Sequence, residues 1–198
     1  MKLHLNKTSP YARLVLVTVH EANLSDKVET VWVEPWEDPP QLLAVNPAGK
    51  VPALLTDAGL ALTESTLICQ YLVGRSASTT LWPSTPELQA DAFHRLGLAR
   101  SAIDCSFGAV IDRRFSEGRT GPLAERWLRA LPRIGAALDN AVAGRDGAAP
   151  DLGDLALCVA FEYIAFRLPE IGWRQNARLT PLAMRLAERQ SLANTRPL

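Results

Sequence analysis

The chain has 198 residues, of which 47% are hydrophobic, and its 21 Lys and Arg residues balance 21 Asp and Glu residues. This share of apolar residues supports a packed core, and the balanced charge argues against nucleic acid or an anionic membrane as a partner. Every uninterrupted apolar run is far shorter than the roughly 18 residues that a membrane-spanning helix needs.

Residues 1–6 lack the charged and apolar regions of a signal peptide and predict the start of a folded domain. The three cysteines are widely spaced and form neither a disulfide framework nor a zinc pattern (Cys69, Cys105, Cys158). The three histidines have no metal-ligand spacing (His4, His20, His94). We therefore expect a cytoplasmic protein without a metal, whose cysteines are packing residues in a reducing compartment.

The first third of the chain predicts an α/β domain. After a short apolar start, Ser9 and Pro10 indicate a helix that begins with a serine cap and a proline in its first position, and it continues to about His20. Residues 28–33 alternate apolar and polar side chains, as a strand does, and Trp32 is expected in the core. Four prolines make residues 34–48 a predicted loop.

Residues 50–63 predict a β-hairpin around the turn at 57–59, and apolar residues at helical spacing predict a helix over 64–72. The order is βαβ followed by ββα. Because two parallel strands joined within about thirty residues need a helical crossover, this pattern predicts one small mixed sheet.

Strand signals end near residue 76, and a segment rich in Ser, Thr and Pro at 77–85 is the predicted linker. The sequence thus predicts an N-terminal domain over 1–76 and an all-helical domain over 86–198. Its helices are expected at 86–117, at 122–142 with a kink at Pro132, at 152–167 in the core, and at 180–190 with Pro181 in the first position. Trp127 is expected in the core.

Four strings carry the strongest functional signals. They are Thr8-Ser9-Pro10-Tyr11-Ala12-Arg13, Asn46-Pro47-Ala48-Gly49-Lys50-Val51-Pro52-Ala53-Leu54, Thr63-Glu64-Ser65-Thr66-Leu67-Ile68 and Asp151-Leu152-Gly153-Asp154. Together and in this order they resemble the glutathione S-transferase family, with a serine-type residue at the first position. The resemblance implies a thioredoxin-like N-terminal domain. The last string resembles a helix-capping box, with Gly153 as an unusual residue in a first turn.

In this family the residue matching Ser9 contacts the sulfur of glutathione; the alternative is that Ser9 only caps its helix. The resemblance also implies a cis Val51–Pro52 bond, with the Val51 backbone groups turned outward to pair with the cysteinyl backbone of glutathione. Lys50 would neutralise the glycyl carboxylate. The alternative is a Pro-Gly loop before an edge strand, with a solvated lysine.

Glu64 would hold the γ-glutamyl ammonium, and the Ser65 hydroxyl with the free N–H groups of the helix start would hold the γ-glutamyl carboxylate. A carboxylate for the ligand's ammonium and hydrogen-bond donors for the ligand's carboxylate suit a zwitterionic ligand. The alternative is a helix cap made by Thr63 or Ser65, with Glu64 in the first turn.

A second, electrophilic substrate is expected between the domains, where small-molecule pockets often lie. Tyr11 is a candidate wall residue because it follows Ser9, and three residues are candidates from helical position alone (Ser106, Phe107, Arg113). The family implies a homodimer. The predicted activity is glutathione transfer to a small electrophile; a glutathione-dependent peroxidase, lyase, etherase or isomerase and a non-catalytic binding or regulatory protein are the alternatives.

Overall fold

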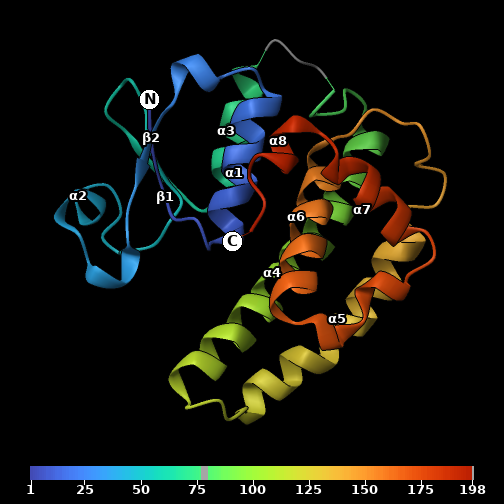
Figure 1. Cartoon of the computed structure of the whole chain (residues 1–198). Helices are drawn as coiled ribbons and strands as arrows, with labels where there is room; N and C mark the ends of the chain where they lie inside the picture. Colours follow the sequence, from blue (N-terminus) through green and yellow to red (C-terminus); the bar gives the residue numbers. More distant parts are fainter. Residues whose placement is uncertain (77–79, 198) are drawn as a thin grey trace. The chain divides into compact units, whose positions relative to one another are not determined.

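The computed structural model describes residues 1–76 and 80–197. The chain divides into two compact units, one formed by Met1–Leu81 with Pro197 and the other by Trp82–Arg196 (Figure 1). Residues 77–79 of the predicted linker lie outside the described residues. None of the helices in the described ranges is both long enough and apolar enough to cross a membrane.

The first unit is a four-stranded mixed sheet with helices. Its elements are β1 (Lys2–Leu5), α1 (Pro10–Glu21), η1 (Ser25–Lys27), β2 (Glu29–Trp32), η2 (Pro35–Glu37), α2 (Pro40–Leu43), β3 (Ala53–Leu55), β4 (Ala61–Thr63) and α3 (Ser65–Gly74). The strand order is β2-β1-β3-β4, with β1 parallel to β2 and the other pairs antiparallel. This confirms the predicted order βαβ-ββα and the thioredoxin-like fold of the first domain.

The strand register brings three distant segments to one end of this sheet. His4 of β1 pairs with Ala53 of β3, and Ala53 pairs with Thr63 of β4. We call these three residues the end row. The chain leaves β1 and β4 just after the end row and enters β3 just before it, because β3 is antiparallel to both neighbours.

Two layers of side chains cover the sheet. Helices α1 and α3 pack side by side on one face, and α2 lies on the other (Figure 1). Leu42 of α2 packs with Val33 and Ala53, so the α2 face has a small apolar core of its own. Paired residues of neighbouring strands point to the same face, which places His4 on the α2 face beside Ala53.

The start of α1 follows the sequence prediction closely. Ser9 is the N-cap, and its hydroxyl oxygen accepts a hydrogen bond from the Ala12 N–H at 3.2 Å. Pro10 occupies the first helical position, where its missing N–H costs nothing. The helix ends at Glu21, and Asn23 takes a left-handed φ of 56° that turns the chain away.

The second unit is helical. Its elements are α4 (Pro86–Phe115), α5 (Pro122–Ala141), α6 (Leu152–Arg167), η3 (Pro169–Ile171), η4 (Trp173–Gln175), α7 (Leu179–Ala187) and α8 (Gln190–Ala193). Helix α4 packs along both α5 and α6, and α6 packs against α7. The capping box at the start of α6 is formed as predicted, with the Asp151 and Asp154 side chains each accepting the backbone N–H of the other residue.

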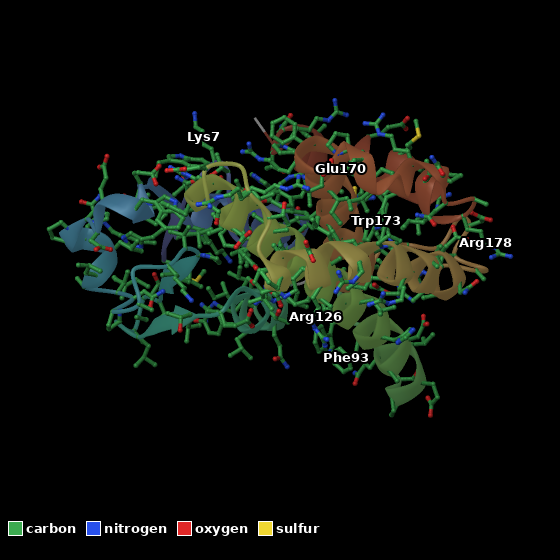
Figure 2. All side chains as sticks on the ribbon, turned by 90° about the horizontal axis from the view of Figure 1, so that it is seen from below. Lys7, Phe93, Arg126, Glu170, Trp173 and Arg178 are labelled. Carbon is green, nitrogen blue, oxygen red and sulfur yellow. The ribbon has the colours of Figure 1, made fainter. Side chains whose placement is uncertain are left out.

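Glycines mark the closest approaches in this unit. A Cβ on Gly153 of α6 would lie 2.5 Å from the Ala92 carbonyl oxygen of α4, and one on Gly135 would lie 2.7 Å from the Trp173 ring. Trp173 is buried in this unit (Figure 2), and its indole N–H donates to the Leu131 carbonyl at 2.9 Å. Gly153 therefore permits tight packing between α4 and α6, rather than merely weakening its helix.

Several sequence predictions were wrong in detail. The proline-rich segment that was predicted as a loop contains α2. The sequence did not predict this helix because its four residues are too few to give a periodic signal. Trp32 is 49% exposed, with the Lys7 ammonium 5.9 Å from its ring centroid, because β2 is an edge strand. The helix predicted at 180–190 begins at Leu179, so Pro181 is its third residue and not its first. It ends at Ala187, and α8 follows as a separate helix.

Candidate functional site

The residues predicted to bind a small peptide meet around the end row. Ser9 follows β1, Val51 and Pro52 precede β3, and Glu64 and Ser65 follow β4. The strand order places the Val51 segment between the other two. Three strings spread over more than fifty residues are thus brought to one end of the sheet by its register.

At the β1 end, Ser9 is mostly buried and acts as the helix cap described above. A hydroxyl has one donor and two acceptor positions, so accepting the Ala12 N–H leaves its O–H able to donate to another group. Capping and contact with a ligand are therefore compatible roles. Asn6 shapes the approach to Ser9: its Oδ1 accepts the Thr8 N–H at 2.9 Å, and its Nδ2 donates to the Val33 carbonyl at 3.1 Å.

In the middle segment the Val51–Pro52 bond is cis, as the resemblance implied. Among the residues that the structure describes, no hydrogen bond is made by the N–H or the carbonyl of Val51. Lys50 is exposed and Pro52 is buried. The segment thus presents an unpaired backbone donor and acceptor, which an added peptide strand requires. The cationic side chain of Lys50 lies next to them in the sequence.

At the β4 end, Glu64 is itself the N-cap of α3, so the alternative cap by Thr63 or Ser65 was wrong. The Glu64 carboxylate accepts the N–H groups of Thr66 and Leu67 at 3.0 and 3.3 Å, and the Ser65 hydroxyl donates to it at 3.1 Å. Glu64 has a positive φ of 73°, a conformation that a side chain with a Cβ rarely adopts. An unusual backbone thus aims one acid and one hydroxyl at the helix start.

The protein's own thiols are poorly suited to be nucleophiles. Burial raises the pKa of Cys69 to about 12, although its hydrogen bond with Thr18 opposes the shift. Burial and the neighbouring Asp104 carboxylate raise the pKa of Cys105, which is partly exposed. Cys158 is buried. Since the thiolate is the reactive form, the raised pKa values make Cys69 and Cys105 weak nucleophiles near neutral pH.

The remaining candidates fall in both units. Tyr11 is partly buried in the second position of α1. The other three lie on α4. Ser106 is fully buried and donates to the Ile103 carbonyl of its own helix at 3.1 Å, Phe107 is partly exposed, and Arg113 forms an ion pair with Glu170 at 2.7 Å. Arg113 therefore already has an acidic partner within the second unit.

Sequence reasoning assigned no role to three polar side chains near the end row. Asn6 and Asn46 each accept the N–H two residues ahead, the signature of an Asx turn, and Asn followed by Pro is a turn signal that identifies Asn46. The third is His4, which is 5% exposed and in the end row itself. Burial lowers the pKa of His4, although the Ala53 backbone opposes the shift in part.

Comparisons with known proteins agree with this geometry. Residues 8–74 match the family model "Glutathione S-transferase, N-terminal domain", a range that contains all three strings around the end row. A glutathione S-transferase-like protein of Escherichia coli is 27% identical, and the alignment covers 100% of this chain and 98% of that protein.

Solved structures extend the likeness over both units. A glutathione S-transferase of Methylobacterium radiotolerans, solved in complex with glutathione sulfonate, is 30% identical with a TM-score of 0.89, covering 99% of this chain and 94% of that one. One from Methylobacillus flagellatus, solved with glutathione bound, is 26% identical with a TM-score of 0.89, covering 100% and 99%. With the register of the end row, these matches show that the chain belongs to the glutathione S-transferase family.

Proposed function

We propose that the first unit binds glutathione along the end row and activates its thiol for attack on a small electrophile. The observation that carries this proposal is the unpaired Val51 backbone, with the Ser9 hydroxyl on one side and the Glu64–Ser65 pair on the other. Solved relatives that bind glutathione or its sulfonate support the same choice of ligand.

The segments around the end row suit the parts of an extended tripeptide. In the proposed complex the Val51 N–H and carbonyl pair with the cysteinyl residue, and Lys50 neutralises the glycyl carboxylate. Glu64 holds the γ-glutamyl ammonium. The Ser65 hydroxyl turns from Glu64 to the γ-glutamyl carboxylate at the positive end of α3, while the Thr66 and Leu67 N–H groups stay bonded to Glu64.

The Ser9 hydroxyl then donates to the sulfur. A free thiol has a pKa of about 8.5, and lowering it by two units requires about 2.7 kcal/mol of preference for the thiolate. A hydrogen bond to a charged group contributes about 1.5–3 kcal/mol, and the helix N-terminus about 0.3–1 kcal/mol. One hydroxyl at the start of α1 is therefore nearly sufficient. The thiolate forms the new bond to the electrophilic atom, the bond from that atom to its leaving group breaks, and the leaving group departs with the electron pair. The thiol proton leaves to solvent.

For the electrophile side, Tyr11 next to Ser9 is the candidate within the first unit, and Phe107 and Arg113 of α4 are candidates within the second. Ser106 contributes as part of the packing of α4, since its hydroxyl is engaged within the helix. We also propose that two copies form a homodimer and that the protein acts in the cytoplasm, where its three cysteine thiols stay reduced.

Calorimetric titration with glutathione and with S-methylglutathione tests the proposal. Saturable binding of both is expected, with glutathione gaining affinity relative to its S-methyl form as the pH rises through the pKa of the bound thiol. Such a pH-dependent preference reports the thiolate, because the methylated sulfur cannot ionise. The absence of binding up to about 10 mM, an affinity of only about −2.7 kcal/mol, would overturn the proposed function.

A further inference from the structure

The loop between α2 and β3 is closed by a single buried side chain. The Nδ2 of Asn46 donates to the Lys50 carbonyl at 2.7 Å, and its Oδ1 accepts the Ala48 N–H at 3.1 Å. The Asn46 carbonyl accepts the Gly49 N–H at 2.9 Å. The side chain is only 7% exposed, so water competes poorly for these bonds. Asn46 therefore holds residues 46–50 as one fixed turn.

This turn determines where the Val51 N–H points. The Lys50 carbonyl and the Val51 N–H belong to the same peptide group, which is planar and trans. In such a group the carbonyl and the N–H point in opposite directions. Because Asn46 holds the Lys50 oxygen toward itself, it also holds the Val51 N–H pointing away from the turn.

We propose that Asn46 is a positioning residue for glutathione: without touching the ligand, it fixes the Val51 amide that pairs with the cysteinyl backbone. This inference rests on the proposed function. A donor that is already oriented binds more tightly, because the loop does not have to become ordered when the ligand arrives. Loss of Asn46 should therefore weaken glutathione affinity more than it slows the chemical step at the sulfur.

Thr56 offers a matched control within the same unit. It is also 7% exposed, and its Oγ1 accepts the Leu60 N–H at 3.0 Å, bracing the β3–β4 turn at the other end of the sheet from the end row. Asn46→Ala and Thr56→Ala each remove a buried, loop-bracing side chain, and both should lower the melting temperature. Only the first change lies beside the proposed ligand.

The experiment measures glutathione affinity by calorimetry, turnover at saturating glutathione, and melting temperature for the wild type and both variants. Asn46→Ala should raise the Kd and KM for glutathione about tenfold or more while changing kcat less than about threefold. Thr56→Ala should leave the Kd within about twofold. Equal losses of affinity in the two variants would reduce Asn46 to a general stabiliser of the unit and overturn the inference.

Asn46→Asp tests the proposed role of Asn46 if the alanine variant does not fold. It retains the oxygen that accepts the Ala48 N–H but replaces the donor to the Lys50 carbonyl with an acceptor. We expect the same loss of affinity from it. If wild type binds glutathione and both Asn46 variants match it, this inference alone fails; if wild type does not bind, the proposed function and the inference fail together.

Discussion

The guanidinium of Arg95, fully buried in α4, contacts the carboxylate of Asp151 at the cap of α6 at 2.5 Å. The same guanidinium lies 3.0 Å from Asp154, the other half of the capping box, and Arg145 also pairs with both carboxylates. The start of α6 is thus attached to α4 by buried ion pairs as well as by apolar packing.

We predict that Arg95→Met destabilises the protein strongly, because Asp151 and Asp154 then keep Arg145 alone, among the described residues, as a cationic partner. Removing one member of a buried ion pair typically costs about 3–5 kcal/mol. Arg100→Met, which breaks an exposed ion pair with Asp104 on the same helix, should cost no more than about 1 kcal/mol. Urea unfolding measures both, and equal effects would contradict the role assigned to burial.

Gly153 gives a second test of how closely α4 and α6 approach. Alanine favours a helix by up to about 1 kcal/mol over glycine, but a Cβ at Gly153 would meet the Ala92 carbonyl at 2.5 Å. Gly153→Ala should therefore destabilise the protein by about 1–3 kcal/mol. Gly97→Ala on α4 should be neutral or stabilising, because the added carbon meets no described atom within 4 Å beyond its chain neighbours and the backbone of its own helix. A stabilised Gly153→Ala variant would contradict the close contact.

Ser9→Ala should lower turnover about tenfold or more while changing glutathione affinity little. The change also removes a helix cap, which costs about 1 kcal/mol of stability. Thr85→Ala is the control, because it removes the cap of α4, where the threonine hydroxyl accepts the Leu88 N–H at 3.4 Å. Titration of the bound thiolate by ultraviolet absorbance should show a raised thiol pKa in Ser9→Ala alone. Unchanged turnover would leave Ser9 with the capping role only.

Glu64→Gln separates the charge of Glu64 from its capping role. The amide oxygen still accepts the Thr66 and Leu67 N–H groups, so stability should change little. Glutathione affinity should fall about tenfold or more, since a hydrogen bond between charged groups contributes about 1.5–3 kcal/mol. Glu64→Ala should lose both affinity and stability. A glutamine variant that binds as wild type does would rule out the proposed contact with the γ-glutamyl ammonium.

The buried His4 predicts how stability responds to acid. Burial lowers its folded-state pKa below the ordinary value of 6.5, so the unfolded chain takes up a proton first as the pH falls. Stability should thus be lost from about pH 6.5 down to the lowered pKa, with a slope of up to about 1.4 kcal/mol per pH unit. His4→Leu should flatten this part of the profile in urea unfolding. A His4→Leu profile parallel to that of the wild type would contradict the prediction.

The sequence was most informative where one backbone geometry needs particular residues. Ser9 with Pro10, the cis Val51–Pro52 bond and the Asp151 capping box all appear as predicted. The cap at Ser9 and the capping box are local signals that can be recognised without knowing the fold, whereas the cis bond was implied by the family resemblance. The end row is different, because it depends on pairing between strands up to fifty residues apart, and the family resemblance rather than periodicity predicted that the motifs would meet.

The errors arose where tertiary context decides. Trp32 has the residue type of a core position, but its strand lies at the edge of the sheet. From the local sequence, Gly153 only weakens the first turn of its helix; the structure shows that the nearby Ala92 carbonyl leaves no room for a Cβ there. The cap formed by Glu64 depends on a left-handed backbone that its residue type disfavours. Neighbours distant in sequence impose each of these features, so a reading of the local sequence cannot supply them.

Because β3 is antiparallel to its neighbours, the β3–β4 turn and the segments proposed to bind glutathione lie at opposite ends of the sheet. Every segment proposed to touch glutathione leaves the sheet at the end row, whereas the turn between β3 and β4 leaves it at the opposite end, where Gly59 has no neighbour within 4 Å of an added carbon. A side chain attached to that turn leaves the pairing of the end row unchanged, whereas a one-residue slip of β3 would turn Ala53 and its neighbours to the opposite face. The exposed Ala58 in the turn at 57–59 is therefore the natural attachment point for a spectroscopic label, since Gly59 has a left-handed φ of 79°. The loop at 46–51 is the segment that such engineering must leave alone.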